Sequence, residues 1–284
     1  MQIFLGPFHP HLEEALIREL LQVKESGPLT PLLVLVPSDT LRRRLKTLIA
    51  EEKGLSLLNL HLLTFYQLSR VLYQEAHPGK EPDIQREIFF EEGLREMFRR
   101  HVSDGSPFLG LDETQGGCAA LWQTFRDLKD AMIDPELCSE ALREGYFGRG
   151  GGSKLTALLH LFRYFREEGA KWNTADYTDL DVLAAEQVPV SPFLQSFPRI
   201  FYYGFYDLTQ VQLDLFGKIA KQYPTLLFFP WMAGHPGWSF AQRFYERHIQ
   251  GWVANPLQIQ NLMERETGGL LPDRLFRDEI GENG

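Results

Sequence analysis

The chain has only two cysteines among its 284 residues, Cys118 and Cys138, and neither belongs to a Cys-x-x-Cys pair. This excludes a disulfide framework and a cysteine-rich metal site, so we expect two reduced thiols. The chain also lacks a charged-then-apolar leader, and no apolar run approaches the roughly 18 residues of a membrane-spanning helix. We therefore expect a cytoplasmic protein with no membrane partner.

The chain also contains fewer basic than acidic residues. The 29 lysines and arginines are outnumbered by 38 aspartates and glutamates, which gives a net charge of −9. Such a balance opposes strong, indiscriminate binding to nucleic acid. Apolar residues are ample, because 44% of the chain is hydrophobic and 13% is aromatic. This content can build a sizeable core in one large domain or two.

The beginning of the chain has the layout of a phosphate-binding loop. Residues Gln2–Leu5 form a short apolar run, typical of a buried strand, and Gly6 follows as the start of a loop. Apolar residues then recur at helical spacing, which predicts one face of a helix: Leu12, Leu16, Leu20 and Val23. Strand, glycine loop and helix is the context in which a P-loop holds nucleotide phosphates.

The residues that such a loop needs are missing. The P-loop pattern is G-x-x-x-x-G-K-[ST], whereas His11, Leu12 and Glu13 stand at its Gly, Lys and Ser/Thr positions. Pro7 and Pro10 carry no backbone N–H, so two possible phosphate donors are lost. The carboxylate of Glu13 would repel a phosphate. We interpret Gly6, His11, Leu12 and Glu13 as a degenerate nucleotide site and expect no cofactor there.

A second segment, residues 199–220, has an equivalent gap. The short apolar run Ile200–Tyr203 predicts a strand, followed by Gly204, Asp207 and a helix. In P-loop ATPases a strand in this place ends in acids that hold Mg²⁺ and orient the attacking water. Tyr203 and Gly204 stand at the positions of the acidic pair, so we expect no catalysis by these residues. Asp207 is expected to cap the helix that follows it.

Two other strand-to-helix turns are candidates for contact with DNA. The apolar run Leu32–Pro37 predicts a strand covered on both faces, and Leu60–Leu63 predicts another. Both turns should emerge at the carboxyl edge of a parallel sheet. The candidate residues that follow the two strands are Ser38, Thr40, Arg42, Arg43, Arg44, Thr64 and Tyr66.

Each of these residue types has a way to contact DNA. Hydroxyls and helix-start N–H groups can bind phosphate oxygens, arginines add a salt-dependent attraction, and a tyrosine face can stack on a base. The alternative for the arginines is a solvated helix face that pairs with Glu51 and Glu52.

The pattern of the chain changes near residues 83 and 190. Strand and helix patterns alternate over residues 1–82, and only helical patterns occur over 83–190. Strand patterns return within 191–284, at Arg199–Tyr203 and Thr225–Phe229. We therefore predict an α/β fold, a P-loop or RecA-like parallel sheet with an inserted all-helical domain. Within the helical region, Gly148–Lys154 imitates a phosphate loop, but it follows a helix rather than a strand, which favours an ordinary connection.

Taken in order, these segments resemble superfamily I helicases. The turn after the second strand matches motif Ia, Thr64–Leu68 is similar to a TFH-x-L motif with Tyr66 for the histidine, and Tyr177–Ala185 is similar to a DF-x-DLL helix. The Y-G-F-x-D-L-T-x-x-Q spelling of Tyr203–Gln212 resembles AddB/RexB-type subunits of bacterial helicase–nucleases. These are inactivated superfamily I helicases with a C-terminal nuclease domain, although many of them keep a recognisable P-loop.

The resemblance covers about residues 1–230 and implies a function. It implies a catalytically inactive, helicase-like scaffold that acts in DNA recombination and repair by guiding DNA and docking a motor subunit of the AddA type. The DNA is expected to be single-stranded and to bind weakly. It also implies that the chain is the N-terminal part of a longer protein. Two alternatives stay open: a cryptic ATPase with unorthodox nucleotide contacts, and a protein-interaction module that has lost DNA binding too.

Overall fold

The computed structural model describes residues 1–102, 104–114, 116–146, 152–172, 174–232, 235–252 and 258–265. In this part of the chain, one sheet of six strands has the order β3-β2-β4-β5-β1-β6, with all neighbours parallel. The strands are β1 (Gln2–Gly6), β2 (Leu32–Leu35), β3 (Leu60–Leu63), β4 (Ile200–Tyr203), β5 (Thr225–Pro230) and β6 (Ile259–Asn261). The predicted α/β class with a parallel sheet is confirmed, and β1 to β5 lie where the sequence predicts strands. The edge strand β6 was not predicted.

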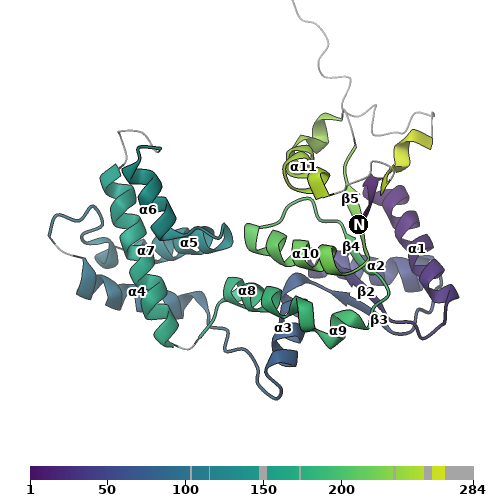
Figure 1. The fold of residues 1–284 in the computed structure, drawn as a ribbon, viewed down its shortest axis with the longest axis horizontal. Helices are drawn as coiled ribbons and strands as arrows, with labels where there is room; N and C mark the ends of the chain where they lie inside the picture. Colours follow the sequence, from purple (N-terminus) through teal and green to yellow (C-terminus); the bar gives the residue numbers. More distant parts are fainter. Residues whose placement is uncertain are drawn as a thin grey trace, which may run out of the picture.

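Apolar side chains alternate between the two faces of the sheet, and helices cover both (Figure 1). On one face Phe4, Val34 and Tyr203 pack against α1 (Glu13–Glu25) and α2 (Asp39–Thr47). On the other face the strands pack against α3 (Phe65–Ala76), α8 (Tyr177–Gln187), α9 (Pro192–Gln195), α10 (Gln210–Gln222) and α11 (Ser239–Phe244). This two-sided burial explains why β2, β4 and β5 consist almost entirely of large apolar residues.

The helix that follows β4 begins two residues later than expected. Asp207 is exposed, whereas Thr209 is the N-cap of α10 and its hydroxyl accepts a hydrogen bond from the backbone N–H of Gln212 at 3.3 Å. The prediction that Asp207 caps this helix is therefore wrong. An N-cap side chain must reach the N–H groups of the first helical turn, and a threonine with a glutamine three residues later satisfies both halves of a capping box.

The remaining long helices form a group beside the sheet (Figure 1). We call α4 (Glu87–His101), α5 (Gly117–Asp130), α6 (Pro135–Arg143) and α7 (Gly152–Trp172) the helical cluster. Its apolar core contains aromatic side chains such as Phe90, Phe125 and Phe162, and it shares no residue with the two cores against the sheet, as far as the described residues go. The helical cluster thus has a hydrophobic core of its own.

Two linkers, residues 77–86 and 174–176, connect the helical cluster to the rest of the chain. The described residues between β3 and β4 contain no strand, only an isolated bridge where the linkers meet, between Ile84 and Ala175. Helix α8 lies in the predicted helical region but packs on α3 and α10, with Ala184 and Ala185 in the sheet core. Most of the Gly148–Lys154 segment lies outside the described residues.

Both cysteines, Cys118 and Cys138, are free thiols, as predicted. Among the helices of the described ranges, none combines the length and the apolar character that crossing a bilayer requires.

Candidate functional site

The two degenerate segments lie at the same edge of the sheet. Strand β5 pairs with β1 on one side and with β4 on the other, so Gly6, the last residue of β1, and Gly204, directly after β4, lie on either side of a single intervening strand. The backbone N–H of Gly204 donates to Phe228 of β5 at 3.0 Å, and the carbonyl of Gly6 accepts from Trp231 at 3.2 Å. After Gly6 the chain forms a short turn, Phe8–Leu12, that leads into α1. The two segments therefore face a shared region at the carboxyl edge of the sheet.

Side chains of the chain itself occupy the region in front of Gly204. This glycine has a φ of +84°, and a Cβ atom placed on it would lie 2.5 Å from Cδ2 of Leu41 and 2.9 Å from Cε1 of Phe8. The Phe8 ring also lies against Tyr203, with 5.8 Å between the ring centroids. Contacts this close leave no room for a bound group between the Phe8 ring and the end of β4.

An ion pair occupies the end of the Gly6 loop. Glu13, at the Ser/Thr position of the P-loop pattern, is only 5% exposed. Its Oε1 accepts hydrogen bonds from Nη2 of Arg44 at 2.9 Å and from Nε of Arg44 at 3.2 Å. Its Oε2 lies 2.9 Å from Nδ1 of His9. The negative charge of Glu13 is therefore matched within the protein by an arginine of α2.

Arg44 forms ion pairs with two carboxylates, those of Glu13 and Glu52. Its hydrogen bonds to Glu52 and then to Glu13 raise the pKa of its guanidinium further above the ordinary value. The same contact with Arg44 lowers the pKa of Glu52. Of the expected alternative, in which the arginines pair with Glu51 and Glu52, the structure contains the pair between Arg44 and Glu52.

Tyr203 stands where an ATPase would place a metal-binding acid, and it is 1% exposed. Burial is the main cause that raises the pKa of its hydroxyl, and the nearby charge of Glu13 raises this pKa further. The phenol thus stays neutral at physiological pH. Mg²⁺ requires anionic or strongly polar oxygen ligands, which a buried neutral phenol packed against Phe8 does not supply.

The candidate hydroxyls of Ser38 and Thr64 follow the carboxyl ends of β2 and β3, which pair in parallel, so both lie at the same edge of the sheet. Ser38 is the N-cap of α2 and accepts from the N–H of Leu41 at 3.2 Å. Thr64 is the N-cap of α3 and forms a capping box with Gln67. Both hydroxyls therefore have structural partners, while Thr40, in the first turn of α2, is exposed.

The three consecutive arginines have different environments. Arg42 donates from Nη1 to Oε1 of Gln67 at 3.1 Å and pairs with Asp39 at 2.9 Å, so it connects α2 to the start of α3. Arg44 pairs with Glu13 at the end of the Gly6 loop and with Glu52. Arg43 is exposed, and neither it nor the exposed Lys46 forms an ion pair with the part of the chain that the structure describes.

Tyr66 is 37% exposed and contacts the ring of Tyr177 edge to face, with 5.0 Å between the centroids. Sequence reasoning missed Gln67, Phe8 and Leu41 as contributors to these turns. The Thr-x-x-Gln spacing at Thr64 is a capping-box signal that predicts the role of Gln67. No comparable local signal exists for Phe8 and Leu41, because their contacts with Gly204 join three distant segments.

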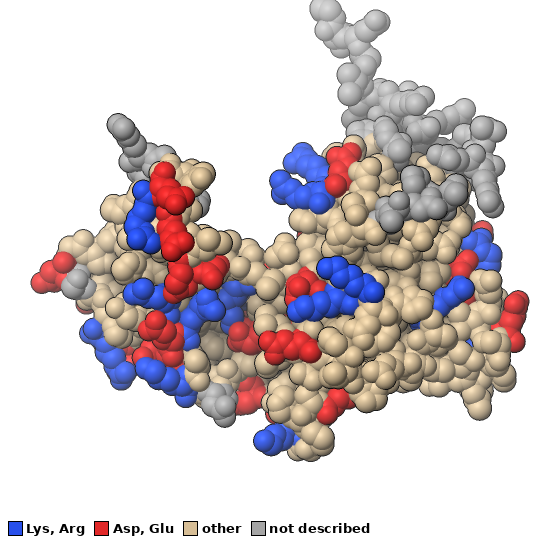
Figure 2. All heavy atoms as spheres, in the orientation of Figure 1, with Lys and Arg blue, Asp and Glu red and all other residues tan. Residues whose placement is uncertain are grey.

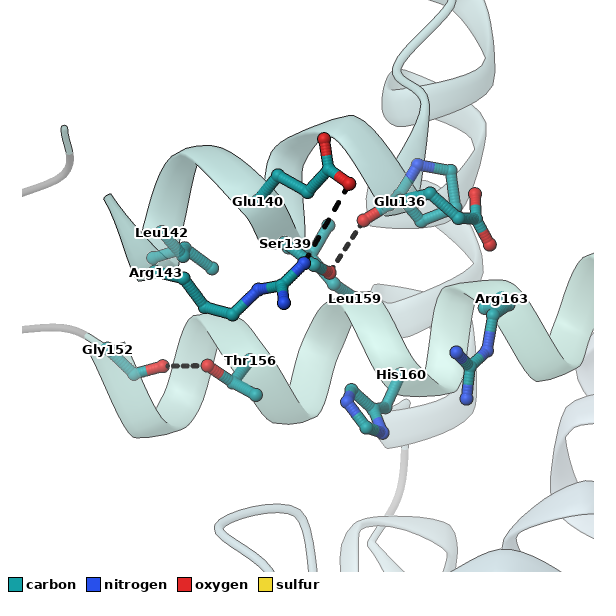
Figure 3. A pocket seen from close by; sticks show the side chains of 11 residues that line it. Glu136, Ser139, Glu140, Leu142, Arg143, Gly152, Thr156, Leu159, His160 and Arg163 are labelled. Atoms are coloured by element: carbon teal, nitrogen blue, oxygen red, sulfur yellow. Dashed lines mark hydrogen bonds and ion pairs between the residues drawn. The ribbon is translucent and has the colours of Figure 1, made fainter. Parts of the chain in front are cut away.

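A separate cavity of about 440 Å³ lies in the helical cluster between α6 and α7 (Figure 3). The two arginines that line it have local partners: Arg143 lies 3.8 Å from Glu140, and Arg163 lies 3.8 Å from Glu167. Figure 1 places α6 and α7 away from the sheet edge that holds Gly6 and Gly204. The cavity therefore belongs to neither candidate site.

Within the described ranges, no three His, Cys, Asp or Glu side chains are grouped so as to hold a metal ion. No protein-family model matches this chain, and no curated protein matches it.

Proposed function

We propose that this chain is a catalytically inactive, helicase-like scaffold of a helicase–nuclease that processes DNA double-strand breaks, and that it guides DNA and docks a motor subunit of the AddA type. The observation that carries the proposal is that side chains of the chain itself fill the place where a P-loop ATPase binds its nucleotide. Phe8 and Leu41 pack against Gly204, and Arg44 pairs with Glu13. A scaffold that needs no nucleotide can fix this region permanently with its own side chains.

The proposed fold is a RecA-like core with an inserted helical domain. The all-parallel sheet, with Gly6 at the end of β1 and Gly204 directly after β4 on either side of β5, is compatible with a RecA-like arrangement. The separate core of the helical cluster, between β3 and β4, supports an inserted domain.

Several independent features oppose nucleotide binding at the Gly6 loop. Pro7 and Pro10 cannot donate backbone hydrogen bonds to phosphate oxygens. Leu12, at the lysine position, is completely buried in the core under α1 and carries no charge. Glu13 would place a negative charge beside the phosphates unless its pair with Arg44 were kept. Replacing any one of these residues would therefore not restore nucleotide binding, because the others would still oppose it.

Contact with DNA is proposed at the carboxyl edge near β2 and β3. Arg43 and Lys46 are exposed cations on α2, the helix that begins at this edge, and Tyr66 and Tyr177 offer exposed aromatic faces. Over the face of the helical cluster shown in Figure 2, basic side chains are interspersed with acidic ones. With a net charge of −9, the isolated chain should bind a single strand weakly and in a salt-dependent manner.

Isothermal titration calorimetry with ATP and Mg²⁺ is expected to show no saturable heat, even at millimolar nucleotide. The physical reason is the loss of phosphate donors and metal-binding acids together with the filled space before Gly204. Measured hydrolysis should equal the background rate without protein. Saturable binding, or hydrolysis above background, would favour the alternative of a cryptic ATPase.

Replacing Arg43 and Lys46 together by alanine is expected to weaken binding of a labelled oligo-dT strand. Fluorescence anisotropy at several salt concentrations should show a shallower salt dependence, by about 1.4 in the log–log slope if both cations contact phosphates of a single strand. These residues suit the test because, unlike Arg42 and Arg44, they form no ion pair within the described ranges.

A double variant with Lys53→Ala and Lys221→Ala removes the same charge from exposed positions elsewhere and is the control. Its salt dependence should equal that of the parent. Equal losses in both double variants would mean that only net charge matters. If the parent itself does not bind at low salt, the protein-interaction module becomes the better proposal.

A further inference from the structure

The contact between the helical cluster and the sheet-side helices is made in part by charged side chains. Helix α5 belongs to the helical cluster, whereas α8 packs on α3 and α10. The two hydrophobic cores share no residue among the described positions. The end of α5 therefore meets the beginning of α8 at a junction that no common apolar core crosses.

Lys129, in the last turn of α5, connects the two parts directly. Its Nζ lies 2.7 Å from Oδ2 of Asp176, the N-cap of α8, and 2.8 Å from Oδ1 of Asp179 in the first turn of that helix. The side chains of Lys129 and Asp176 are 14% and 6% exposed. A pair so little exposed is weakly screened by salt, and losing one partner leaves an uncompensated charge.

Carboxylates outnumber cations around Lys129, even with Arg166 of α7, which lines a small cavity together with Lys129 and Asp179. Asp130 follows it in the chain and accepts a hydrogen bond from the hydroxyl of Thr178 in α8. Asp181, one turn further along α8, is buried and accepts from Ser69 of α3 at 2.6 Å. Without Lys129, Asp130 on one side of the junction would face the carboxylates of Asp176 and Asp179 on the other, and like charges repel.

The same junction also contains free space. A cavity of about 710 Å³ is lined by both linkers and by α7, with His77, Lys80, Asp83, Gly169, Thr174 and Ala175 among its residues. The linkers are joined to each other by two backbone hydrogen bonds of 3.0 Å, from Gln85 to Ala175 and from Ala175 to Asp83. The linkers can therefore act as a paired hinge beside a space that the helical cluster could enter.

We propose that Lys129 is an electrostatic latch that holds the helical cluster in one orientation against α8, and that its release lets the cluster turn about the linkers 77–86 and 174–176. The latch does not depend on the proposed function, because it uses only contacts within this chain. Its release would break the ion pairs of Lys129 and the hydrogen bond from Thr178 to Asp130, while the two hydrophobic cores stay intact.

The test measures a distance across the junction by pulsed electron paramagnetic resonance. Spin labels are attached after His160→Cys in α7 and Lys221→Cys in α10, both exposed positions, with Cys138→Ser to remove the less buried native thiol. Proteins with only one introduced cysteine verify that the buried Cys118 stays unlabelled. The parent is expected to give one narrow distance distribution.

Lys129→Gln is expected to widen this distribution by about twofold and to shift its mean, since the neutral side chain no longer offsets the carboxylates. The matched control is Arg126→Gln, one turn earlier on α5, because Arg126 pairs with Glu87 of α4 inside the helical cluster at 2.7 Å. The control should match the parent. Circular dichroism checks that each variant keeps its helix content.

A second variant tests the same latch from the other side. Asp176→Asn with Asp179→Asn removes both partners of Lys129, and asparagine is as good an N-cap as aspartate. It should widen the distribution as Lys129→Gln does. Narrow, parent-like distributions in both variants would overturn the proposal, and so would equal widening in the Arg126→Gln control.

Discussion

Replacing Gly204 by alanine is expected to lower the free energy of unfolding by about 3 kcal/mol, through backbone strain and overpacking together. Its φ of +84° lies in the left-handed region, and the new Cβ would lie 2.5 Å from Leu41 and 2.9 Å from Phe8. Both neighbours are side chains that pack against the core under α1 and α2. Urea denaturation of the parent and the variant measures the difference.

Gly79→Ala separates the two causes. Gly79 has a φ of +75°, but nothing lies within 4 Å of a Cβ placed on it. This control should lose only the backbone term, about 1 to 2 kcal/mol. If Gly204→Ala lowers the free energy of unfolding no more than Gly79→Ala does, then Phe8 and Leu41 move aside at little cost, and the region at the end of β4 can open for a ligand. In that case the cryptic ATPase gains support.

A double variant tests the contact with Phe8 directly. Phe8→Ala removes the ring that a Cβ at Gly204 would meet, so the combined variant should lose less stability than the sum of the two single variants. An additive result would show that the cost at Gly204 does not involve Phe8.

Replacing Asp181 by asparagine is expected to raise the free energy of unfolding at pH 7.5 by up to about 3 kcal/mol. Burial, with smaller contributions from the charges of Asp130 and Asp176, raises the pKa of Asp181 from 3.8 to about 6, although its hydrogen bond from Ser69 acts in the opposite direction. An asparagine side chain keeps an oxygen that accepts from Ser69 and carries no charge to bury.

The pH dependence has a definite sign. Since the folded protein binds the proton of Asp181 more tightly than the unfolded chain does, this group favours folding below about pH 4, and the advantage is lost as the pH rises through about 6. The parent should therefore gain stability relative to Asp181→Asn as the pH falls from 7.5 to 5. Thermal or urea unfolding of both proteins across this range isolates the contribution of Asp181.

Asp214→Asn is the control for this substitution. Asp214 lies on α10, is 34% exposed and pairs with Lys218 at 2.7 Å. Surface pairs of this kind contribute about 0 to 1 kcal/mol, so the control should change stability little. Parallel pH curves for the parent and Asp181→Asn would mean that Asp181 is ionised and hydrated in the folded protein.

Sequence patterns were sufficient for the main strands. Runs such as Leu32–Leu35 and Thr225–Pro230 are apolar on both sides because helices cover both faces of the sheet, and continuous apolarity is visible in a single sequence. Strand β6 has only three residues, two of them polar, and is defined by its pairing with β1. A strand that depends on an available edge leaves no such pattern.

The arginine run shows where sequence reasoning ends. Successive residues of a helix point in directions about 100° apart, so Arg42, Arg43 and Arg44 must face three environments. The sequence predicted that the run follows a strand and begins a helix, which the structure confirms. Only the tertiary contacts of α2 decided that Arg42 reaches Gln67 in α3, that Arg44 reaches Glu13 in α1 and that Arg43 remains exposed.

By itself the sequence determined what the Gly6 loop lacks. The missing lysine and hydroxyl, the two prolines and the absent acids after β4 are matters of residue type, and residue type fixes which donors, ligands and charges a segment can supply. The tertiary structure alone decided what takes their place. Phe8, Leu41 and Gly204 are distant in the chain, and they meet because β5 lies between β1 and β4 and because α2 packs beside α1. Strand order and helix packing bring such segments together, and no local pattern of residues encodes that order.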